Sequence, residues 1–437
     1  MADGTHDLLE QKRALARRRA YEAPLETLNP AWASAFRDDA CWPYFERLRA
    51  EDPVHWTPDS NYGAFWSITK YNDILAIDSN HQAFSSAKGI TLNPKPSVLP
   101  PEAFPESSTK RDESDDANSF INMDPPRHDI QRKTVSPGVA PARLAEMAPL
   151  IRERAGRILD SLPIGEAFDW VDLVSKELTT MTLATLFDFP FEERRKLTIW
   201  SDAMTTAPGH GPWNTYDERR KLLAECRAYF ISLWNQRVNA PPAGDLISML
   251  AHGPETRASS MDQYFSNVTL LIIGGNDTTR NTISGSVFAL NRFPAENQKL
   301  RAEPSLIPSM VSETIRWQTP LAHMARTATR DFDFGGKTIG EGDRVVMWYV
   351  SGNRDEEVIE DPYAYRIDRA QPRRHLSFGF GVHRCVGNRL AELQLTIIWE
   401  EILKRFPEIR LLEEPRRSYS IFIKGYEEMK VLIPRRN

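Results

Sequence analysis

Apolar residues return at helical spacing through most of the chain, and one such segment is much longer than the others. Between about residues 145 and 250 they recur every three or four positions with charged residues between them, which predicts several amphipathic helices. The longest periodic segment runs from Ser260 to about Arg292. Ser260 followed by Gln263 is typical of a helix start, and Pro294 predicts the stop. Such a helix would be about 50 Å long and could cross a whole domain.

Two regions have strand-like patterns. A predicted helix begins at Trp42, and the runs 54–56 and 64–69 follow it on either side of a turn. Much later, residues 328–350 alternate strand-like runs with two glycine-containing turns, which predicts a β-meander.

Three segments interrupt these patterns. Residues 1 to about 30 predict a polar helix, and their basic cluster, 12–19, fits a solvated face. Residues 85–121 are rich in proline and serine and acidic around 112–116, which favours an irregular loop. The stretch TTAPGHGPWN, residues 205–214, breaks a helical region and is a candidate lid over an active-site mouth.

Composition excludes several classes of protein. The 437 residues contain no linker, repeat or low-complexity tract, so we expect one domain over 1–437. A hydrophobic content of 41% can supply a large core, and a net charge of −5 is too small to indicate a nucleic-acid partner. The most apolar short run, 268–273, is far shorter than the roughly 20 residues that span a bilayer. Three separated cysteines and a polar N-terminal sequence argue against disulfides and a signal peptide. We expect a cytoplasmic protein, and a monomer, with no nucleic-acid or membrane partner.

The candidate chemistry begins with HLSFGFGVHRCVGNRL, residues 375–390. This stretch places Cys385 in a glycine-rich loop directly before a predicted helix. Gly379, Gly381 and Gly387 would let the backbone approach a large flat ligand closely. At a helix start, free N–H groups and the helix dipole favour a thiolate, which is the form that binds metal. A thiolate beside a flat ligand suggests haem iron, whereas the alternative is a buried, inert cysteine.

A second polar pattern lies in MDPPRHDIQRK, which starts at Met123. Asp124 is a plausible N-cap, the two prolines suit the first helical turn, and His128 and Arg132 share a helix face. A solvated basic face is the alternative for this pair.

The long predicted helix carries LLIIGGNDTTRN in its middle. Gly274 and Gly275 should weaken the helix just before Asp277 and Thr278. If these residues had no special task, Thr278 would bond back to the carbonyl of Gly274 and Asp277 would pair with Arg280.

The cysteine loop has the spacing F-x-x-G-x-x-x-C-x-G, and through it the chain resembles the cytochrome P450 monooxygenases. The residues that carry this match are Phe378, Gly381, Cys385 and Gly387. The G-G-x-D-T of the long helix and the E-x-x-R that starts at Glu313 add to the resemblance. It implies a mainly α-helical fold with a smaller β-rich lobe, and haem b between the long central helix and the cysteine loop. The β-rich lobe would take residues about 50–70 and 325–350, and the helical lobe residues about 123–320 and 386–406.

The same resemblance assigns roles to the candidate residues. Cys385 would be the axial ligand of the haem iron, and its thiolate would favour O–O cleavage. Thr278 would position the oxygen, and Asp277 would relay protons from solvent. The haem propionates would be bound by His128, Arg132, Arg326 and His383. Phe378, Gly381 and Gly387 would shape the haem loop, and Glu313, Arg316 and Arg369 would form a buried cluster behind it.

Several longer segments resemble one bacterial group, the soluble terminal alkane and fatty-acid hydroxylases. They are RWQTPLAHMARTA, VMWYVSGNRDEEVIEDP and RHLSFGFGVHRCVGNRLAELQ. This resemblance implies terminal hydroxylation of a medium-length apolar chain, with electrons from NAD(P)H through a ferredoxin reductase and a 2Fe–2S ferredoxin. The substrate would contact Ile273, Gly274, Leu321, Met324, Ile421 and Phe422. Whether the far end of the substrate is a methyl or a carboxylate stays open, because no anchoring cation can be placed from the sequence.

Alternatives remain for both substrate and partner. Hydroxylation of a steroid or terpene is the alternative within the family, and a haem-thiolate sensor or electron carrier is the alternative outside it. The arginines around the cysteine loop would form a basic docking face for an acidic ferredoxin, or else pair with propionates or stay solvated. They are Arg373, Arg374, Arg384 and Arg389.

Overall fold

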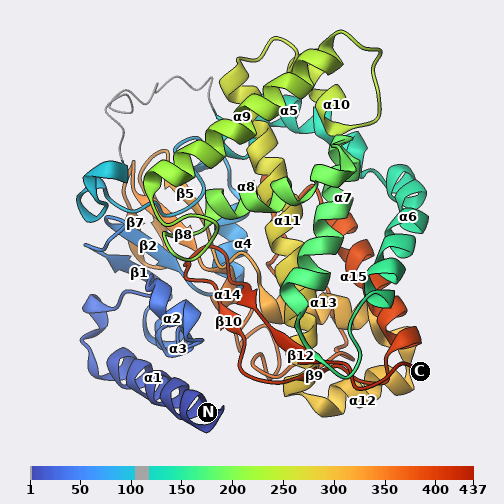
Figure 1. Cartoon of the computed structure of the whole chain (residues 1–437). Helices are drawn as coiled ribbons and strands as arrows, with labels where there is room; N and C mark the ends of the chain where they lie inside the picture. Colours follow the sequence, from blue (N-terminus) through green and yellow to red (C-terminus); the bar gives the residue numbers. More distant parts are fainter. Residues whose placement is uncertain (1, 104–117) are drawn as a thin grey trace.

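The computed structural model describes residues 2–103 and 118–437, and it is mainly helical with small sheets (Figure 1). The helices are α1 (Ala2–Glu22), α2 (Ala33–Arg37), α3 (Trp42–Glu51), α4 (Tyr71–Ser79), α5 (Arg127–Val135), α6 (Pro141–Asp160), α7 (Glu177–Phe187), α8 (Arg195–Thr205), α9 (Tyr216–Val238), α10 (Leu246–His252), α11 (Met261–Arg292), α12 (Pro294–Ala302), α13 (Ile307–Gln318), α14 (Tyr349–Gly352) and α15 (Asn388–Arg405). The strands are β1 (Val54–Thr57), β2 (Phe65–Ile68), β3 (Phe84–Ser85), β4 (Ala167–Asp169), β5 (Met324–Ala328), β6 (Phe332–Phe334), β7 (Lys337–Ile339), β8 (Arg344–Met347), β9 (Arg410–Leu411), β10 (Arg416–Arg417), β11 (Tyr426–Glu428) and β12 (Lys430–Leu432). The predicted fold class is therefore confirmed. Among the described residues, no helix combines the length and apolar character that a membrane span requires.

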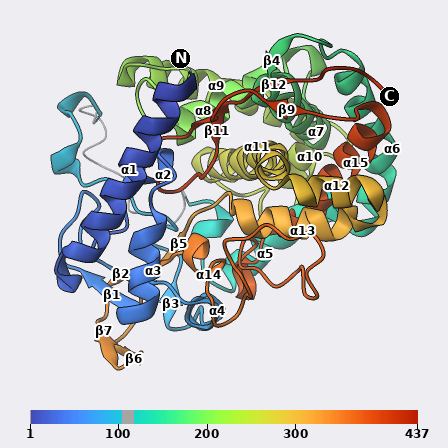
Figure 2. The ribbon, with the colours of Figure 1, turned by 90° about the horizontal axis from the view of Figure 1, so that it is seen from below.

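Helix α11 passes through the middle of the molecule and is seen nearly end-on in Figure 2. The hydroxyl of Ser260 caps it by accepting a hydrogen bond from the N–H of Gln263, and it ends at Arg292 as predicted. Helices α7, α8, α13 and α15 pack around it, and every residue from 279 to 290 is buried. Polar groups on α11 therefore depend on protein partners or on the cavity at its middle.

The largest sheet joins the two regions with strand-like patterns. Its strand order is β1-β2-β8-β5-β3, with β2 parallel to β8 and the other neighbours antiparallel. Gly335 and Gly336, both at positive φ, form the turn between β6 and β7 that the meander prediction required. This sheet matters for function because β5 carries Met324 and Arg326 to the edge of the helical part.

Helix α1 packs against α3 through the buried residues Ala16 and Ala20. Three basic residues of α1 form ion pairs: Lys12 with Asp38, Arg13 with Asp39, and Arg17 with Glu46. The prediction of a solvated basic face over 12–19 is therefore wrong for Arg13, whose side chain is 19% exposed beside Asp39, whereas the side chain of Arg17 stays 62% exposed despite its ion pair.

Helix α5 begins later than predicted, at Arg127, with Pro126 as its N-cap residue. Asp124 does not cap it. The Asp124 carboxylate accepts hydrogen bonds from the hydroxyl of Ser85 and from the N–H of Ser86, the latter at 2.9 Å. The capping prediction is wrong because these competing donors lie far away in the sequence.

The irregular segment predicted over 85–121 is described in part. Beyond Ser85, its described residues form short 3-10 turns at 96–98, 101–103 and 120–122 and no longer helix. Its acidic stretch, 112–116, lies outside the described residues.

Candidate active site

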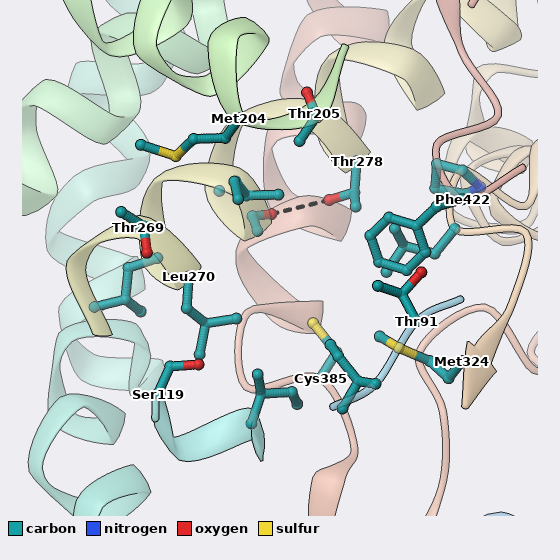
Figure 3. Close-up of a pocket in the computed structure, with 18 of the residues that line it drawn as sticks. Thr91, Ser119, Met204, Thr205, Thr269, Leu270, Thr278, Met324, Cys385 and Phe422 are labelled. Carbon is teal, nitrogen blue, oxygen red and sulfur yellow. Dashed lines mark hydrogen bonds between the residues drawn. The ribbon is translucent and has the colours of Figure 1, made fainter. Parts of the chain in front are cut away.

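One large cavity lies between the middle of α11 and the loop that carries Cys385 (Figure 3). Its volume is about 910 Å³, near the upper end of the range for small-molecule sites. We call residues 376–388 the floor of this cavity, and residues 90–94, 118–122 and 204–219 its roof. Both contribute lining residues.

The residues expected to contact the substrate all line this cavity. They are Ile273, Gly274, Leu321, Met324, Ile421 and Phe422. In Figure 3, Met324 and Phe422 lie on one side of Cys385, and Leu270 lies on the other. Leu270 was not predicted, although it precedes Gly274 by one helical turn, and this same-face spacing could have identified it.

The floor is closed by backbone contacts around the cysteine. Cys385 lies between the turn Gly381–His383 and the start of α15 at Asn388. Its N–H donates to the carbonyl of Phe378 over 2.8 Å. Gly387 borders the cavity, and a Cβ at this position would meet no atom within 4 Å. The missing side chain of Gly387 therefore leaves space for a ligand, as the sequence suggested.

Gly381 has a different reason to be glycine. It does not border the cavity, its φ is +65°, and a Cβ there would lie 2.7 Å from the carbonyl oxygen of Asp78. Glycine is therefore required because the floor packs closely against α4. The expectation that Gly381 makes room for the ligand is wrong, because it makes room for the protein.

The Cys385 sulfur is accessible from the cavity while the remaining protein encloses it. Desolvation raises the pKa of this thiol, whereas the N–H groups of Gly387 and Asn388 and the guanidinium groups of Arg132 and Arg384 act to lower it. The N–H groups that the sequence analysis expected beside the sulfur are therefore present and act in the expected direction, and desolvation opposes them. A bound metal cation would supply the additional positive charge that a thiolate requires.

Unpartnered imidazole groups lie beside the floor. Both ring nitrogens of His383, which borders the cavity, and Nε2 of His128 are buried without a partner in the described part of the chain. The two ring centroids are 4.2 Å apart. Burial lowers the pKa of both side chains, to about 2 for His383, so a neutral His383 can donate one N–H. The N–H of His128 lies on Nδ1 and donates to the Asp129 carboxylate over 2.7 Å. Arg132 and Arg326 also border the cavity. Because unpaired buried donors are costly, this group fits a flat cofactor that carries acidic substituents, as haem does.

Asp78 on α4 is a site residue that the sequence analysis missed. Its buried carboxylate accepts hydrogen bonds from Arg326 (2.8 Å), the hydroxyl of Tyr349 (2.7 Å) and the N–H of Phe380 in the floor (2.8 Å). Asp78 therefore positions both the floor and a cavity-lining arginine. A single aspartate in an apolar helix carries no motif, so no local signal identified it.

Glu313, Arg316 and Arg369 form one buried cluster. Both carboxylate oxygens of Glu313 bind Arg316 at 2.8 Å, and both lie 3.0 Å from Nε of Arg369. Arg316 also donates to the carbonyls of Asn353, Pro362 and Ala364. The cluster therefore attaches the chain before the floor to helix α13.

Asn353 connects this cluster to the floor. Its side-chain oxygen accepts the N–H of Leu376 over 2.7 Å, and its amide donates to the hydroxyl of Ser377 over 2.9 Å. Ser377 in turn donates to the carbonyl of Ile315 on α13 over 2.8 Å. The start of the floor is thus fixed by a saturated set of hydrogen bonds.

The middle of α11 stays helical through Gly274 and Gly275. The hydroxyl of Thr278 donates to the carbonyl of Gly274 over 3.0 Å, the ordinary back-bond of a mid-helix threonine (Figure 3). A Cβ on Gly274 would meet no atom within 4 Å, whereas one on Gly275 would lie 2.9 Å from Leu183 of α7. Gly274 therefore leaves open space beside Thr278, and Gly275 lets α7 approach.

Asp277 is fully buried and does not line the cavity. Its Oδ1 accepts the hydroxyl of Ser201 (3.1 Å) and pairs with Arg280 (2.9 Å), while Oδ2 has no partner in the described ranges. Arg280 also binds Asp202 (2.6 Å), and Asp202 contacts the partly exposed Lys176 (3.3 Å). Burial raises the pKa of Asp277 despite the opposing effect of Arg280. A chain of ionisable groups thus leads from α11 toward the surface.

The roof includes the loop between α8 and α9. Helix α8 ends at Thr205 and α9 begins at Tyr216, so the predicted helix break is confirmed, and residues 204–208 and Trp213 line the cavity. The connecting loop forms turns of its own, such as the 3.0 Å hydrogen bond from the N–H of Gly209 to the carbonyl of Trp213.

His323 ties another part of the roof to the C-terminal region. Its Nε2 accepts the N–H of Leu92 (3.3 Å) and contacts the hydroxyl of Thr91 (3.1 Å), so Nδ1 donates to the carbonyl of Ile421 (3.0 Å). Burial lowers the pKa of His323 to about 3.

Comparison with known proteins agrees with this geometry. The family model described as "Cytochrome P450" matches residues 238–416. Linalool 8-monooxygenase of Pseudomonas putida is 34% identical over 393 residues, which are 89% of this chain and 94% of that protein. The methyl-branched lipid omega-hydroxylase of Mycobacterium tuberculosis (strain ATCC 25618 / H37Rv) is 30% identical over 410 residues, 91% of this chain and 92% of the relative.

A solved structure gives the same result. Cytochrome P450-153 from Novosphingobium aromaticivorans is 42% identical, has a TM-score of 0.83, and the match covers 93% of this chain and 99% of that one. The named relatives are oxygenases, so the comparisons favour an enzyme over a sensor or electron carrier. This chain belongs to the cytochrome P450 family and is a monooxygenase.

Proposed function

We propose that this monooxygenase hydroxylates the terminal methyl group of a medium-length apolar chain, an alkane or a fatty acid. The observation that carries the proposal is the large cavity whose apolar side chains lead from the roof to the Cys385 sulfur. The omega-hydroxylase among the relatives and the P450-153 structure support it.

The family implies haem, and the floor residues fit it. Cys385 would bind the iron, and Arg132, Arg326, His128 and His383 would bind the propionates through charge-assisted hydrogen bonds. When bound, haem b supplies the activation of dioxygen for insertion of one oxygen atom into a C–H bond.

Terminal selectivity must come from the cavity walls. A methyl C–H bond is stronger than an internal one and would lose a free competition between positions. Apolar side chains around the space above Cys385 would hold the chain so that only its end comes near the reacting centre. Leu321, Met324 and Phe422 are the residues we assign to this role.

Protons reach the cavity through α11. Thr278 lines the cavity above Cys385, and its hydroxyl, once released from the Gly274 carbonyl, would deliver a proton there that Asp277 would replace. The unpartnered Oδ2 of Asp277 is available to carry that proton. Arg280 and Asp202 connect Asp277 to Lys176 near the surface.

Electrons would come from NAD(P)H through a ferredoxin reductase and a 2Fe–2S ferredoxin. Four arginines around the floor are exposed and suit an acidic partner: Arg373, Arg374, Arg384 and Arg389. Such exposed charges would affect mainly the association rate.

Hydroxylation of a terpene is the second candidate. The observation that favours it is the 34% identity to linalool 8-monooxygenase, since linalool is a terpene alcohol.

Product analysis separates these candidates. The haem-loaded protein, supplied with ferredoxin, reductase and NAD(P)H, is incubated separately with alkanes, fatty acids, linalool and a sterol. We expect terminal alcohols from the linear chains as the dominant products. Internal alcohols from those chains, or turnover of linalool or the sterol alone, would contradict the proposal.

A further inference from the structure

An arginine lies at the roof of the cavity, opposite the cysteine. Among the described residues, three arginines line the cavity, and two of them, Arg132 and Arg326, border the floor. The third is Arg219, in the first turns of α9. Its Nε donates to the carbonyl of Ala203 over 2.8 Å. The next residue, Met204, lies at the side of the cavity facing Cys385 in Figure 3, so Arg219 belongs to the far end.

The charge of Arg219 is not balanced by an acidic side chain within the described ranges. In the described part of the chain, its one hydrogen-bond acceptor is the backbone carbonyl of Ala203. Desolvation lowers its pKa, and Tyr216 is the only group that acts against this effect. The adjacent Arg220 is different, because it pairs with Asp217 and also donates to the carbonyl of Glu102. Of these two neighbouring arginines on α9, Arg220 thus has an acidic partner and Arg219 has none among the described residues.

An unsatisfied donor lies beside Arg219. Trp213 also lines the cavity, is 2% exposed, and its indole N–H has no acceptor in the part of the chain that the structure describes. The Arg219 guanidinium carbon is 5.6 Å from the centroid of the Trp213 ring. A buried donor without an acceptor is costly, and here the Trp213 indole N–H lies beside a half-buried guanidinium that has no acidic partner among the described residues. Together, the free N–H and the unbalanced charge at one cavity wall point to an anionic acceptor that enters the cavity.

We propose that Arg219 and Trp213 form a carboxylate-binding subsite, and that the preferred substrates are fatty acids that enter methyl end first. The inference rests on the proposed terminal hydroxylation and deepens it by naming the substrate class. A carboxylate held at the roof leaves the apolar chain to run along the cavity wall toward Cys385. An alkane of equal length lacks this anchor and relies on apolar contacts alone.

The test compares ligands that differ only in charge. A fatty acid, its methyl ester and the alkane of equal chain length are titrated into the haem-loaded protein, and binding is followed by the change in the haem spectrum. The wild-type protein should bind the acid about tenfold or more tightly than the ester, because hydrogen bonds to charged groups are strong. Equal affinity for acid and ester in the wild-type protein would overturn the proposal.

Variants locate the effect. Arg219→Gln should weaken acid binding about tenfold and leave alkane binding within about twofold, so that the preference for acid over ester disappears. Arg219→Lys should keep part of that preference, because it retains the charge but loses the planar fork. Trp213→Phe, which removes the indole N–H, should weaken binding of the fatty acid about threefold. Arg220→Gln is the matched control, because it removes the same charge one residue away. This variant should leave the affinities for the acid, the ester and the alkane unchanged.

The outcomes separate this subsite from the proposed reaction. Equal weakening of acid and alkane by Arg219→Gln would mean that Arg219 only supports the fold, and would overturn the subsite. An acid that binds through Arg219 but is hydroxylated at an internal carbon would support the subsite and contradict terminal hydroxylation. Should Arg219→Gln not fold, the acid–ester comparison in the wild-type and Arg219→Lys proteins decides the question.

Discussion

The floor and the roof of the cavity are built in opposite ways. At the floor, the backbone N–H groups of Leu376, Phe380 and Cys385 all have acceptors, and the unpartnered imidazole of His383 borders the cofactor side of the cavity. At the roof, Arg219 has no acidic partner and the indole of Trp213 has no acceptor among the described residues. The floor is therefore suited to one cofactor in one orientation, whereas the roof keeps donors available for a substrate that comes and goes.

The buried cluster behind the floor should have the largest effect on stability. Glu313→Ala leaves Arg316 and Arg369 without their carboxylate, and Arg316 is only 1% exposed. We expect a loss of about 3–5 kcal/mol in the free energy of unfolding, because a stranded buried charge is costly. Urea unfolding measures this loss.

Glu360→Ala is the matched control for that variant. Glu360 forms an exposed ion pair with Arg366 at 3.2 Å, and its side chain is 79% exposed. Its removal should cost less than about 1 kcal/mol. Similar losses in the two variants would mean that the floor is not held by the cluster.

Loss of proton delivery should have the next largest effect, and that effect is on product formation. Asp277→Asn keeps the size of the side chain but cannot take up and release a proton, so product formation should fall about 100-fold. Product formed per NAD(P)H consumed is measured alongside substrate binding, which should not change because Asp277 does not line the cavity. Wild-type turnover in this variant would remove Asp277 from the relay.

The attachment of the roof should depend on pH. The pKa of His323 in the folded protein is about 3, below its usual value of 6.5, so between these values the unfolded chain binds more protons. Stability contributed by the neutral His323 is therefore lost as pH falls below 6.5, by about 1.4 kcal/mol per pH unit. The free energy of unfolding, measured with urea, should fall more steeply between pH 6.5 and pH 4.5 in the wild-type protein than in His323→Gln. Parallel curves for the two proteins would contradict this role.

The sequence was informative where the chemistry is local. The limits of α11 follow from Ser260 and Pro294, and the cysteine loop follows from its glycine spacing. The sequence could not predict the roles of Asp78 and Arg219, because these roles depend on partners or cavity walls contributed by distant segments.

Two of the wrong assignments have the same cause. Asp124 has the sequence pattern of a helix cap, but Ser85 and Ser86 from a distant segment bind its carboxylate. Gly381 fits a ligand motif, but a carbonyl of α4 explains why it must be glycine. A local pattern identifies that a residue is constrained without identifying which neighbour constrains it.

The central claim is that the Cys385 sulfur binds the iron of a haem below α11. The direct measurement is the absorption spectrum of the carbon monoxide complex of the reduced, haem-loaded protein, for the wild type and for Cys385→Ser. We predict the spectrum of a thiolate-bound haem in the wild type and its loss in the variant. A thiolate spectrum that survives in Cys385→Ser, or a nitrogen-ligated spectrum in the wild type, would contradict the account.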